Sequence, residues 1–168
     1  NEISKSVGNQ YEENPYPKWV RVAKPVKPLG TKERQKEYNL YFPLRVANLD
    51  QPNILIAGCG TGQQAIELAL HYPNCNITAI DLSKRSLAYA IRKTQEYGIN
   101  NISYKHGDLL NVSNLKNRYD LIESQGVLHH MADPIEGWTA LVGVLNKGGL
   151  MNIGLYSRIA RRHITAIR

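Results

Sequence analysis

A short glycine-rich segment constrains the fold of this chain more than any other feature of its sequence. Residues 54–57 (Ile-Leu-Ile-Ala) form a continuous apolar run, which is typical of a strand buried on both faces of a parallel sheet. Gly58, Gly60 and Gly62 follow at once, and glycine lets the backbone turn sharply and approach a ligand closely because it has no Cβ atom. The next helix directs its free N–H groups at that ligand. The segment therefore predicts a small-molecule site at the carboxyl edge of the first strand.

Strands and helices are predicted to alternate along the rest of the chain. The strands are expected at residues 53–57, 76–81, 102–105, 119–124 and 148–155. The helices are expected at residues 62–71, 84–97 and 134–145, with a last helix from about residue 158. Strands separated by helices imply right-handed crossovers and a parallel sheet, so we predict an α/β fold with a Rossmann-like, doubly wound sheet.

The residues before the first strand are predicted to form a separate arm. Residues 1–30 contain four prolines, at positions 15, 17, 25 and 28, and we expect them to be extended or irregular rather than helical. A helix is expected at residues 32–49, with Thr31 as its N-cap and Pro43 as an interruption. We thus divide the chain into an N-terminal arm and helix at 1–49, a ligand-binding core at 50–156 and the start of a basic C-terminal helix at 157–168.

Composition excludes several classes of protein. The chain has 168 residues, of which 42% are hydrophobic, and this is enough for one domain with a real core. No apolar run reaches the roughly 18 residues of a membrane span, and no signal peptide is recognisable. Two cysteines, Cys59 and Cys75, do not make a disulfide scaffold, so we expect a reducing, cytoplasmic location. The absence of a Cys-x-x-Cys or His-x-x-x-His pair predicts no metal site.

The net charge of +7 is concentrated at the two ends of the chain. Residues 1–48 carry nine Lys or Arg against five Asp or Glu, and residues 158–168 carry four Arg and no acid. Residues 49–157 carry eight basic and nine acidic side chains. A basic chain is compatible with a nucleic-acid partner, but solvated basic ends that flank a neutral body are the simpler explanation. We therefore expect no nucleic-acid partner.

The second predicted strand ends in an acid. Asp81 follows Gly62 by 19 residues, and a carboxylate at that place accepts hydrogen bonds from two ribose hydroxyls. The same residue is equally well placed to cap the following helix. A ribose-binding acid is common to several nucleotide-binding folds, so Asp81 alone does not identify the ligand.

The spacing of the glycines narrows the choice. A dinucleotide fingerprint needs Gly-x-Gly-x-x-Gly, whereas this chain has Gly58-x-Gly60-x-Gly62, with Gln63 at the place of the third dinucleotide glycine. The segment resembles motif I of the class I S-adenosylmethionine (SAM) methyltransferases. The resemblance covers roughly residues 50–156 and implies SAM as the cofactor and a strand order of 3-2-1-4-5. The family's usual sixth and seventh strands have no room here, so we expect a C-terminally truncated sheet.

Three further segments share this resemblance. Gly107-Asp108-Leu109 resembles the motif whose acid and following N–H bind adenine, and residues 119–131 resemble motif IV, with Ser124 and Gln125 beside the methionine part of SAM. Residues 145–155 resemble the glycine turn into the fifth strand. The resemblance implies the following cofactor-binding residues: Gly58, Cys59, Gly60, Gly62, Gln63, Asp81, Leu82, Asp108, Leu109, Ser124 and Gln125.

Catalysis is assigned to the histidine pair that follows the fourth strand. His129 or His130 is a candidate general base because histidine titrates near neutral pH. Adjacent side chains on a helix point in different directions, so at most one of them faces the substrate, and the alternative is a histidine packed under the site. Cys59 is a poor candidate nucleophile. The motif Asp/Asn-Pro-Pro-Tyr, which marks methylation of amino groups of adenine or glutamine, is absent.

These features together predict methyl transfer from SAM to a small-molecule or protein acceptor. A nicotinamide-dependent oxidoreductase and a non-catalytic SAM-binding module remain as alternatives. Residues 13–19 (Glu-Asn-Pro-Tyr-Pro-Lys-Trp) resemble a segment that precedes the methyltransferase domain of certain bacterial proteins, some of them fused to tetratricopeptide repeats, so a repeat domain outside this chain is a candidate partner. Tyr11, Tyr16 and Trp19 either line the site or pack the arm against the core.

Overall fold

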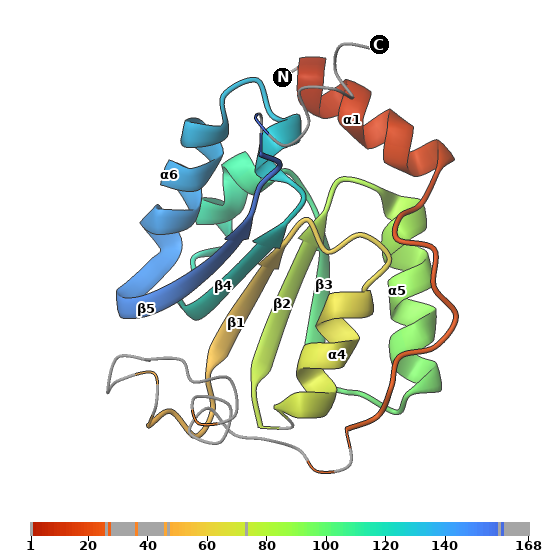
Figure 1. Cartoon of the computed structure of the whole chain (residues 1–168), viewed down its shortest axis with the longest axis vertical. Coiled ribbons are helices and arrows are strands. Elements are labelled where there is room, and N and C mark those ends of the chain that lie inside the picture. Colours follow the sequence, from red (N-terminus) through yellow and green to blue (C-terminus); the bar gives the residue numbers. More distant parts are fainter. Residues whose placement is uncertain are drawn as a thin grey trace.

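In the computed structural model, the described residues form five strands in one parallel sheet (Figure 1). The structure describes residues 2–25, 27, 36, 46, 48–72, 74–157 and 159. The strand order is β3-β2-β1-β4-β5, which confirms the predicted α/β fold and its order. The strands are β1 (Asn53–Ala57), β2 (Asn76–Asp81), β3 (Ile102–His106), β4 (Tyr119–Gln125) and β5 (Leu145–Gly154).

Helices cover both faces of this sheet. On one face, Ile54 and Ile56 pack against α4 (Gln63–His71) and α5 (Lys84–Glu96). On the other face, Leu55 and Ala57 pack against α6 (Pro134–Val144) and the short 3₁₀ helices η1 (Leu109–Leu115) and η2 (Leu128–His130). All four of these β1 side chains are fully buried, as the continuous apolar run predicts, because a central parallel strand has no wet face. No helix among the described residues is long and apolar enough to cross a membrane.

The fifth strand begins earlier than predicted. The strand was expected from residue 148, but it starts at Leu145 and contains the glycine turn as an irregularity in its pairing with β4. Tyr119 pairs with Leu145, and two residues later Leu121 pairs with Leu150. Gly148 adopts a φ of +76° within the irregularity. Asp120 holds it in place, because its carboxylate accepts from the Asn146 side chain at 2.7 Å and from the Asn53 backbone at 3.0 Å.

The prediction of an irregular N-terminus was wrong for its first part. Residues Glu2–Glu13 form the helix α1, which lies over the carboxyl end of the sheet (Figure 1). The four prolines all follow this helix, so they limit its length rather than prevent it. No residue of α1 is buried, and hydrogen bonds join its last turn to the start of α5 and to His130 of η2. The predicted helices at 32–49 and from 158 lie in segments that are mostly outside the described residues.

Glu12 attaches the end of α1 to the start of α5. Its carboxylate accepts from the Ser83 hydroxyl at 2.9 Å and from the Arg85 backbone N–H at 3.1 Å. These hydrogen bonds, Arg85 first, hold the pKa of Glu12 below its ordinary value. The Ser83 hydroxyl also accepts from Ser86 N at 3.0 Å and thereby caps α5. Helix α1 is therefore fixed to the same helix start that follows the β2 acid.

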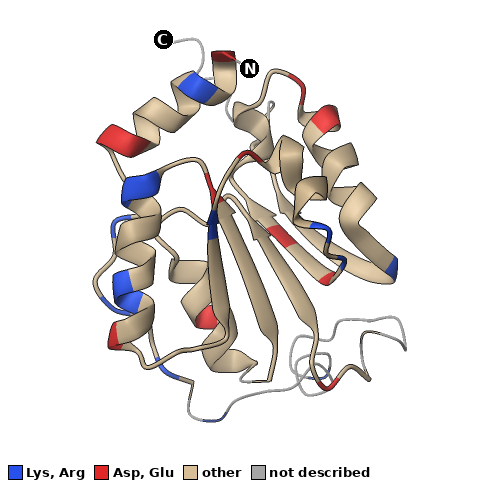
Figure 2. Ribbon diagram, turned by 180° about the vertical axis from the view of Figure 1, so that it is seen from behind, with Lys and Arg blue, Asp and Glu red and all other residues tan. Residues whose placement is uncertain are grey.

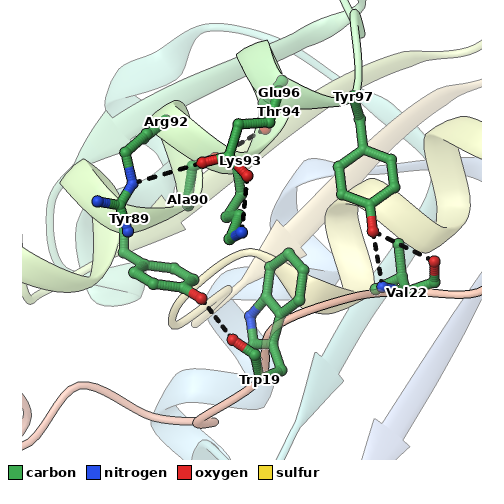
Figure 3. Close-up of polar contacts among 9 residues, drawn as sticks. All are labelled: Trp19, Val22, Tyr89, Ala90, Arg92, Lys93, Thr94, Glu96 and Tyr97. Atoms are coloured by element: carbon green, nitrogen blue, oxygen red, sulfur yellow. Dashed lines mark hydrogen bonds and ion pairs between the residues drawn. The ribbon is translucent and has the colours of Figure 1, made fainter.

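After α1 the chain runs as an extended arm along α5 (Figure 3). The Tyr89 hydroxyl donates to the carbonyl of Trp19, and the two rings meet edge to face with centroids 5.7 Å apart. The Tyr97 hydroxyl accepts from Val22 N at 2.8 Å and donates to Val22 O at 3.2 Å. Both backbone groups of Val22 are thus satisfied by one phenol, much as a neighbouring strand would satisfy them.

A comparison of Gly62 with Gly98 distinguishes the cost of steric overlap from the cost of a left-handed backbone. Its φ is +83°, and a Cβ atom there would lie 2.6 Å from the Cβ of Ala90 and 2.9 Å from the Tyr104 hydroxyl. Gly98 also has a positive φ, of +68°, but a Cβ there would meet nothing within 4 Å. We expect Gly98→Ala to lower the free energy of unfolding by about 1–2 kcal/mol, the cost of a left-handed conformation. Gly62→Ala should cost a further 1–3 kcal/mol or so, because α4 and α5 must separate.

Urea denaturation of the two variants tests this difference. Equal losses of stability would contradict the assignment of Gly62 to helix packing.

Candidate functional site

A cavity of about 620 Å³ lies where the strands β1, β2 and β4 end, beneath α1. Its walls come from the glycine loop, the start of α4, the ends of β2 and β4, the loop after β3, η2, α1 and the arm. The residues that line it are Ile3, Ser4, Val7, Tyr11, Tyr16, Pro17, Gly58, Cys59, Gly60, Gln63, Gln64, Glu67, Ile80, Asp81, Leu82, Asp108, Leu109, Gln125, Gly126, Val127, His130, Met131, Ala132 and Tyr156. The site thus lies at the carboxyl edge of the sheet, where the glycine segment predicts it.

Nine of the eleven predicted cofactor-binding residues line this cavity. Gly62 and Ser124 do not. Gly62 faces α5 rather than the cavity, and the contact with Ala90 explains why no side chain fits there. Ser124 is fully buried, and its hydroxyl donates to the carbonyl of Ala57 at 3.1 Å, which ties β4 to β1. Sequence spacing does not distinguish a glycine or serine that faces a ligand from one that faces a neighbouring element.

The glycine loop is held in place by the end of β2. The backbone N–H groups of Gly58 and Cys59 both donate to the carbonyl of Ile80, at 2.9 and 3.0 Å. Gly58 and Gly60 have φ angles of +79° and +52°, which disfavour any side chain. At Gly60 a Cβ would also collide with the backbone carbonyl of Tyr16, since the arm lies directly over the loop. Thr61 fixes the arm there: its N–H donates to Tyr16 O at 3.1 Å and its hydroxyl to Pro17 O at 2.6 Å.

Asp81 lines the cavity and is hydrogen-bonded through both of its carboxylate oxygens. One carboxylate oxygen accepts from Gly60 N at 2.7 Å, and the other accepts from Ser83 N at 2.9 Å at the start of α5. Each oxygen retains a lone pair, so the group has capacity for further donors from the cavity. Burial raises the pKa of Asp81, and the N–H donors, Ser83 first and then Gly60, oppose that rise.

Asp108 lines the cavity from the loop after β3. Its carboxylate accepts from the Leu110 N–H at 3.0 Å, and it is the N-cap of η1. This contact fixes the carboxylate next to Leu109, whose side chain is buried. The acid and the following residue therefore place a polar and an apolar side chain next to each other at the cavity wall.

Only one of the two candidate histidines faces the cavity. His130 lines it, and its Nε2 atom lies 3.1 Å from the Tyr11 hydroxyl of α1. His129 turns away and stacks on Tyr156, with ring centroids 3.8 Å apart and an interplanar angle of 27°. Burial, followed by Tyr156 and Asp81, raises the pKa of Tyr11, so its hydroxyl keeps its proton. Tyr11 is 119 positions from His130 in the chain, so no local sequence pattern predicts that pairing.

The N-terminal aromatics divide between lining and packing. Tyr11 and Tyr16 line the cavity, whereas Trp19 packs on Tyr89 and donates from its indole N–H to Thr61 Oγ1 at 3.0 Å. Sequence reasoning missed the α1 residues Ile3, Ser4 and Val7, because it did not predict that helix. It also missed Gln64 and Glu67, although their i, i+3 spacing places them on one face of α4.

The cavity is acidic although the chain as a whole is basic. Glu67, Asp81 and Asp108 contribute carboxylates, and none of the described lining residues is Lys or Arg. Figure 2 shows acidic positions in red at the carboxyl end of the sheet and several basic positions in blue along α5. Burial raises the pKa of Cys59 well above its ordinary value, which makes this thiol a poor nucleophile. Within the described part of the chain, no cluster of His, Cys, Asp or Glu is able to hold a metal ion.

The fold and this site define an α/β protein with an acidic cavity at the carboxyl edge of its sheet, under a helical cover. A profile of the family described as "Methyltransferase domain" matches residues 54–149, which is more than half of the chain. The chain therefore belongs to the class I SAM-dependent methyltransferase family.

Curated relatives are considerably longer than this chain. An uncharacterized protein of Synechococcus sp. is 40% identical over 121 residues, which are 71% of this chain and 29% of that protein. A probable (S)-tetrahydroprotoberberine N-methyltransferase of Papaver bracteatum is 30% identical over 82 residues, or 49% of this chain and 23% of that protein. The chain thus spans less than a third of the length of these two relatives.

Solved structures share the fold. The YcgJ protein of Bacillus subtilis superposes with a TM-score of 0.61 at 19% identity, covering 70% of this chain and 51% of that chain. PKMT2 of Rickettsia typhi, solved in complex with AdoHcy, has a TM-score of 0.61 at 23% identity and covers 80% of this chain and 26% of that chain.

Asp81 provides a direct test of the site. We expect Asp81→Ala to weaken SAM binding by about 1.5–3 kcal/mol, the range for hydrogen bonds to a charged group, as measured by calorimetry. The variant should also unfold more easily by about 1 kcal/mol, because the start of α5 loses a carboxylate acceptor.

Asp133→Ala is the matched control. Asp133 caps α6 by accepting from Ile135 N at 2.8 Å, and it does not line the cavity. Its loss should cost similar stability and leave the SAM affinity unchanged. A folded Asp81→Ala protein with unaltered SAM affinity would rule out the ribose role.

Proposed function

We propose that this protein transfers a methyl group from SAM to a small-molecule or protein acceptor. The observation that carries the proposal is the cavity in which the glycine loop, Asp81 and Asp108 converge. Helix α1 covers part of this cavity and favours a small molecule over a folded protein surface as the acceptor. The walls contain no Lys or Arg among the described residues, which disfavours a nucleic-acid acceptor.

The residues present fit SAM. Gly60 lines the cavity with its N–H bound to Asp81 at 2.7 Å, and Asp81 retains free lone pairs beside it for ribose hydroxyls. Asp108 and Leu109 suit an adenine edge, and Gln63, Gln125 and the N-terminus of α4 suit the amino-acid end. Three carboxylates complement a cofactor that carries a net positive charge.

When bound, SAM supplies a sulfonium-activated methyl group that the lone pair of an acceptor displaces in line, with release of S-adenosylhomocysteine (SAH). The protein's own contribution is alignment and removal of the acceptor's proton. We assign the proton transfer to Tyr11 and His130: the Tyr11 hydroxyl takes the proton of the acceptor while it gives its own to Nε2 of His130. His129, packed on Tyr156, supports the ring of its neighbour from below, with centroids 4.3 Å apart.

We further propose that α1 acts as a lid. It contributes Ile3, Ser4, Val7 and Tyr11 to the cavity, and its end is attached through Glu12 to the start of α5. The much greater length of the relatives supports the idea that this domain is fused to others, for which a tetratricopeptide repeat domain is our candidate. Two free, buried cysteines fit a cytoplasmic location.

Two alternatives have specific observations against them. In a nicotinamide-dependent oxidoreductase a third glycine would stand at Gln63, whereas this side chain donates to Glu67 at 3.0 Å within α4. A non-catalytic SAM-binding module would have no use for a tyrosine–histidine pair at the cavity wall.

Calorimetry with SAM, SAH and NAD tests the proposal. We expect SAM and SAH to bind and NAD not to bind. We also expect methyl transfer from labelled SAM to small molecules of a cell extract. Binding of NAD in place of SAM would favour the oxidoreductase, and SAM binding without any transfer would favour the non-catalytic module.

Gly60→Val should abolish SAM binding, because the side chain enters a left-handed position against the Tyr16 carbonyl. Gly143→Val is the control: this glycine of α6 has open space where its Cβ would be and does not line the cavity. Its SAM affinity should equal that of the unaltered protein. Normal SAM binding by a folded Gly60→Val variant would contradict the location of the site.

Tyr11→Phe tests the proton transfer. The variant keeps the ring, which meets His130 edge to face with centroids 5.9 Å apart, and removes only the hydroxyl. We expect the SAH affinity to stay the same, the NMR signals of the His130 ring nitrogens to shift, and methyl transfer to slow by about 10²–10⁴-fold. An unchanged transfer rate would exclude Tyr11 from the reaction.

A further inference from the structure

The charged residues that line the cavity favour some ligands over others. Its acidic side chains come from three different elements: Glu67 from α4, Asp81 from β2 and Asp108 from the loop before η1. No described lining residue carries a fixed positive charge. The electropositive feature that remains is the N-terminus of α4, whose free N–H groups suit the carboxylate of SAM itself. An anionic group on a second ligand therefore has no cation of the described walls to pair with.

The wall on the α1 side is predominantly apolar. Val7 of α1, Met131 and Ala132 after η2, and Tyr156 after β5 face the same cavity as Tyr11 and His130. Aromatic and methionine side chains pack well against flat, apolar ligands. Two polar groups on this side take part in the proposed proton transfer. They are the Tyr11 hydroxyl and the His130 ring, whose Nε2 atom lies 3.1 Å from that hydroxyl.

Contact with this wall makes an unpaired charge costly. A carboxylate or phosphate laid against it loses part of its water, although Tyr156 itself is 56% exposed, and the lost water must be replaced by a cation or by several N–H donors. Three carboxylates around the same cavity add like-charge repulsion. A neutral molecule meets neither penalty, and a cationic amine is attracted.

From these observations we propose that the acceptor is an uncharged or cationic molecule with an apolar body and a hydroxyl or amine as its methylated group. A carboxylate or phosphate on that body weakens binding. This inference rests on the proposed function, because it takes the α1 side of the cavity as the acceptor side and leaves the remainder to SAM.

Three phenols that differ only in charge test the proposal. Tyramine is cationic, para-ethylphenol is neutral and para-hydroxyphenylacetate is anionic. Each is titrated by calorimetry into the full chain saturated with SAH, so that binding is measured without turnover. We expect tyramine and para-ethylphenol to bind, and para-hydroxyphenylacetate to bind at least about tenfold more weakly, as an unpaired buried group should.

Glu67→Gln adds a charge-specific readout. It removes one carboxylate from the wall, and we expect it to lower the affinity for tyramine relative to para-ethylphenol by about two- to fivefold, the size of a weak charge pair. Glu136→Gln is the matched control, because Glu136 is an exposed residue of α6 outside the cavity. That variant should leave the ratio unchanged.

The outcomes distinguish a failure of the proposed SAM site from a failure of the proposed acceptor class. If SAH itself does not bind, the proposed function fails. If SAH binds but the anionic phenol binds as tightly as the others, or if none of the three phenols binds, the inference about the acceptor is overturned while the cofactor site stands.

Discussion

The hydrogen bonds of one carboxylate hold the functional end of this molecule together. Asp81 accepts from Gly60 N and from Ser83 N, and so joins the glycine loop after β1 to the start of α5 after β2. Ser83 in turn donates from its hydroxyl to Glu12 and to the carbonyl of Tyr11. The glycine loop, the end of β2, the start of α5 and helix α1 are therefore joined by these hydrogen bonds, and they surround the cavity.

The sequence predicts those parts of the structure that local chemistry determines. The buried strand β1 follows from a continuous apolar run, and the turn after it from three glycines whose φ angles are all positive. The positions of Asp81 and Asp108 at the edge of the sheet are predictable, because Asp81 ends a strand and Asp108 precedes a helical turn. In each case the residues that carry the signal are neighbours in the chain, so pattern and spacing suffice.

What the sequence does not predict depends on contacts between distant segments. Helix α1 buries none of its residues, and it is fixed by Glu12 at a helix start more than 70 positions away. The choice between His129 and His130 depends on Tyr11, at the other end of the chain. Gly62 is indistinguishable from Gly60 by spacing, and its different role depends on how closely Ala90 of α5 approaches.

Tyr89 and Tyr97 of α5 bind the extended arm that follows α1, and this attachment limits any movement of α1 (Figure 3). Because Trp19 and Val22 are bound to α5, release of the Glu12 contact would leave α1 tethered by only a few residues. Reclosure is then an intramolecular event with a high effective concentration, independent of the concentration of the protein. If α1 opens as proposed, the energetic cost of admitting a ligand falls on one helix and its attachments, while the hydrogen bonds of the glycine loop to β2 and to the arm stay in place.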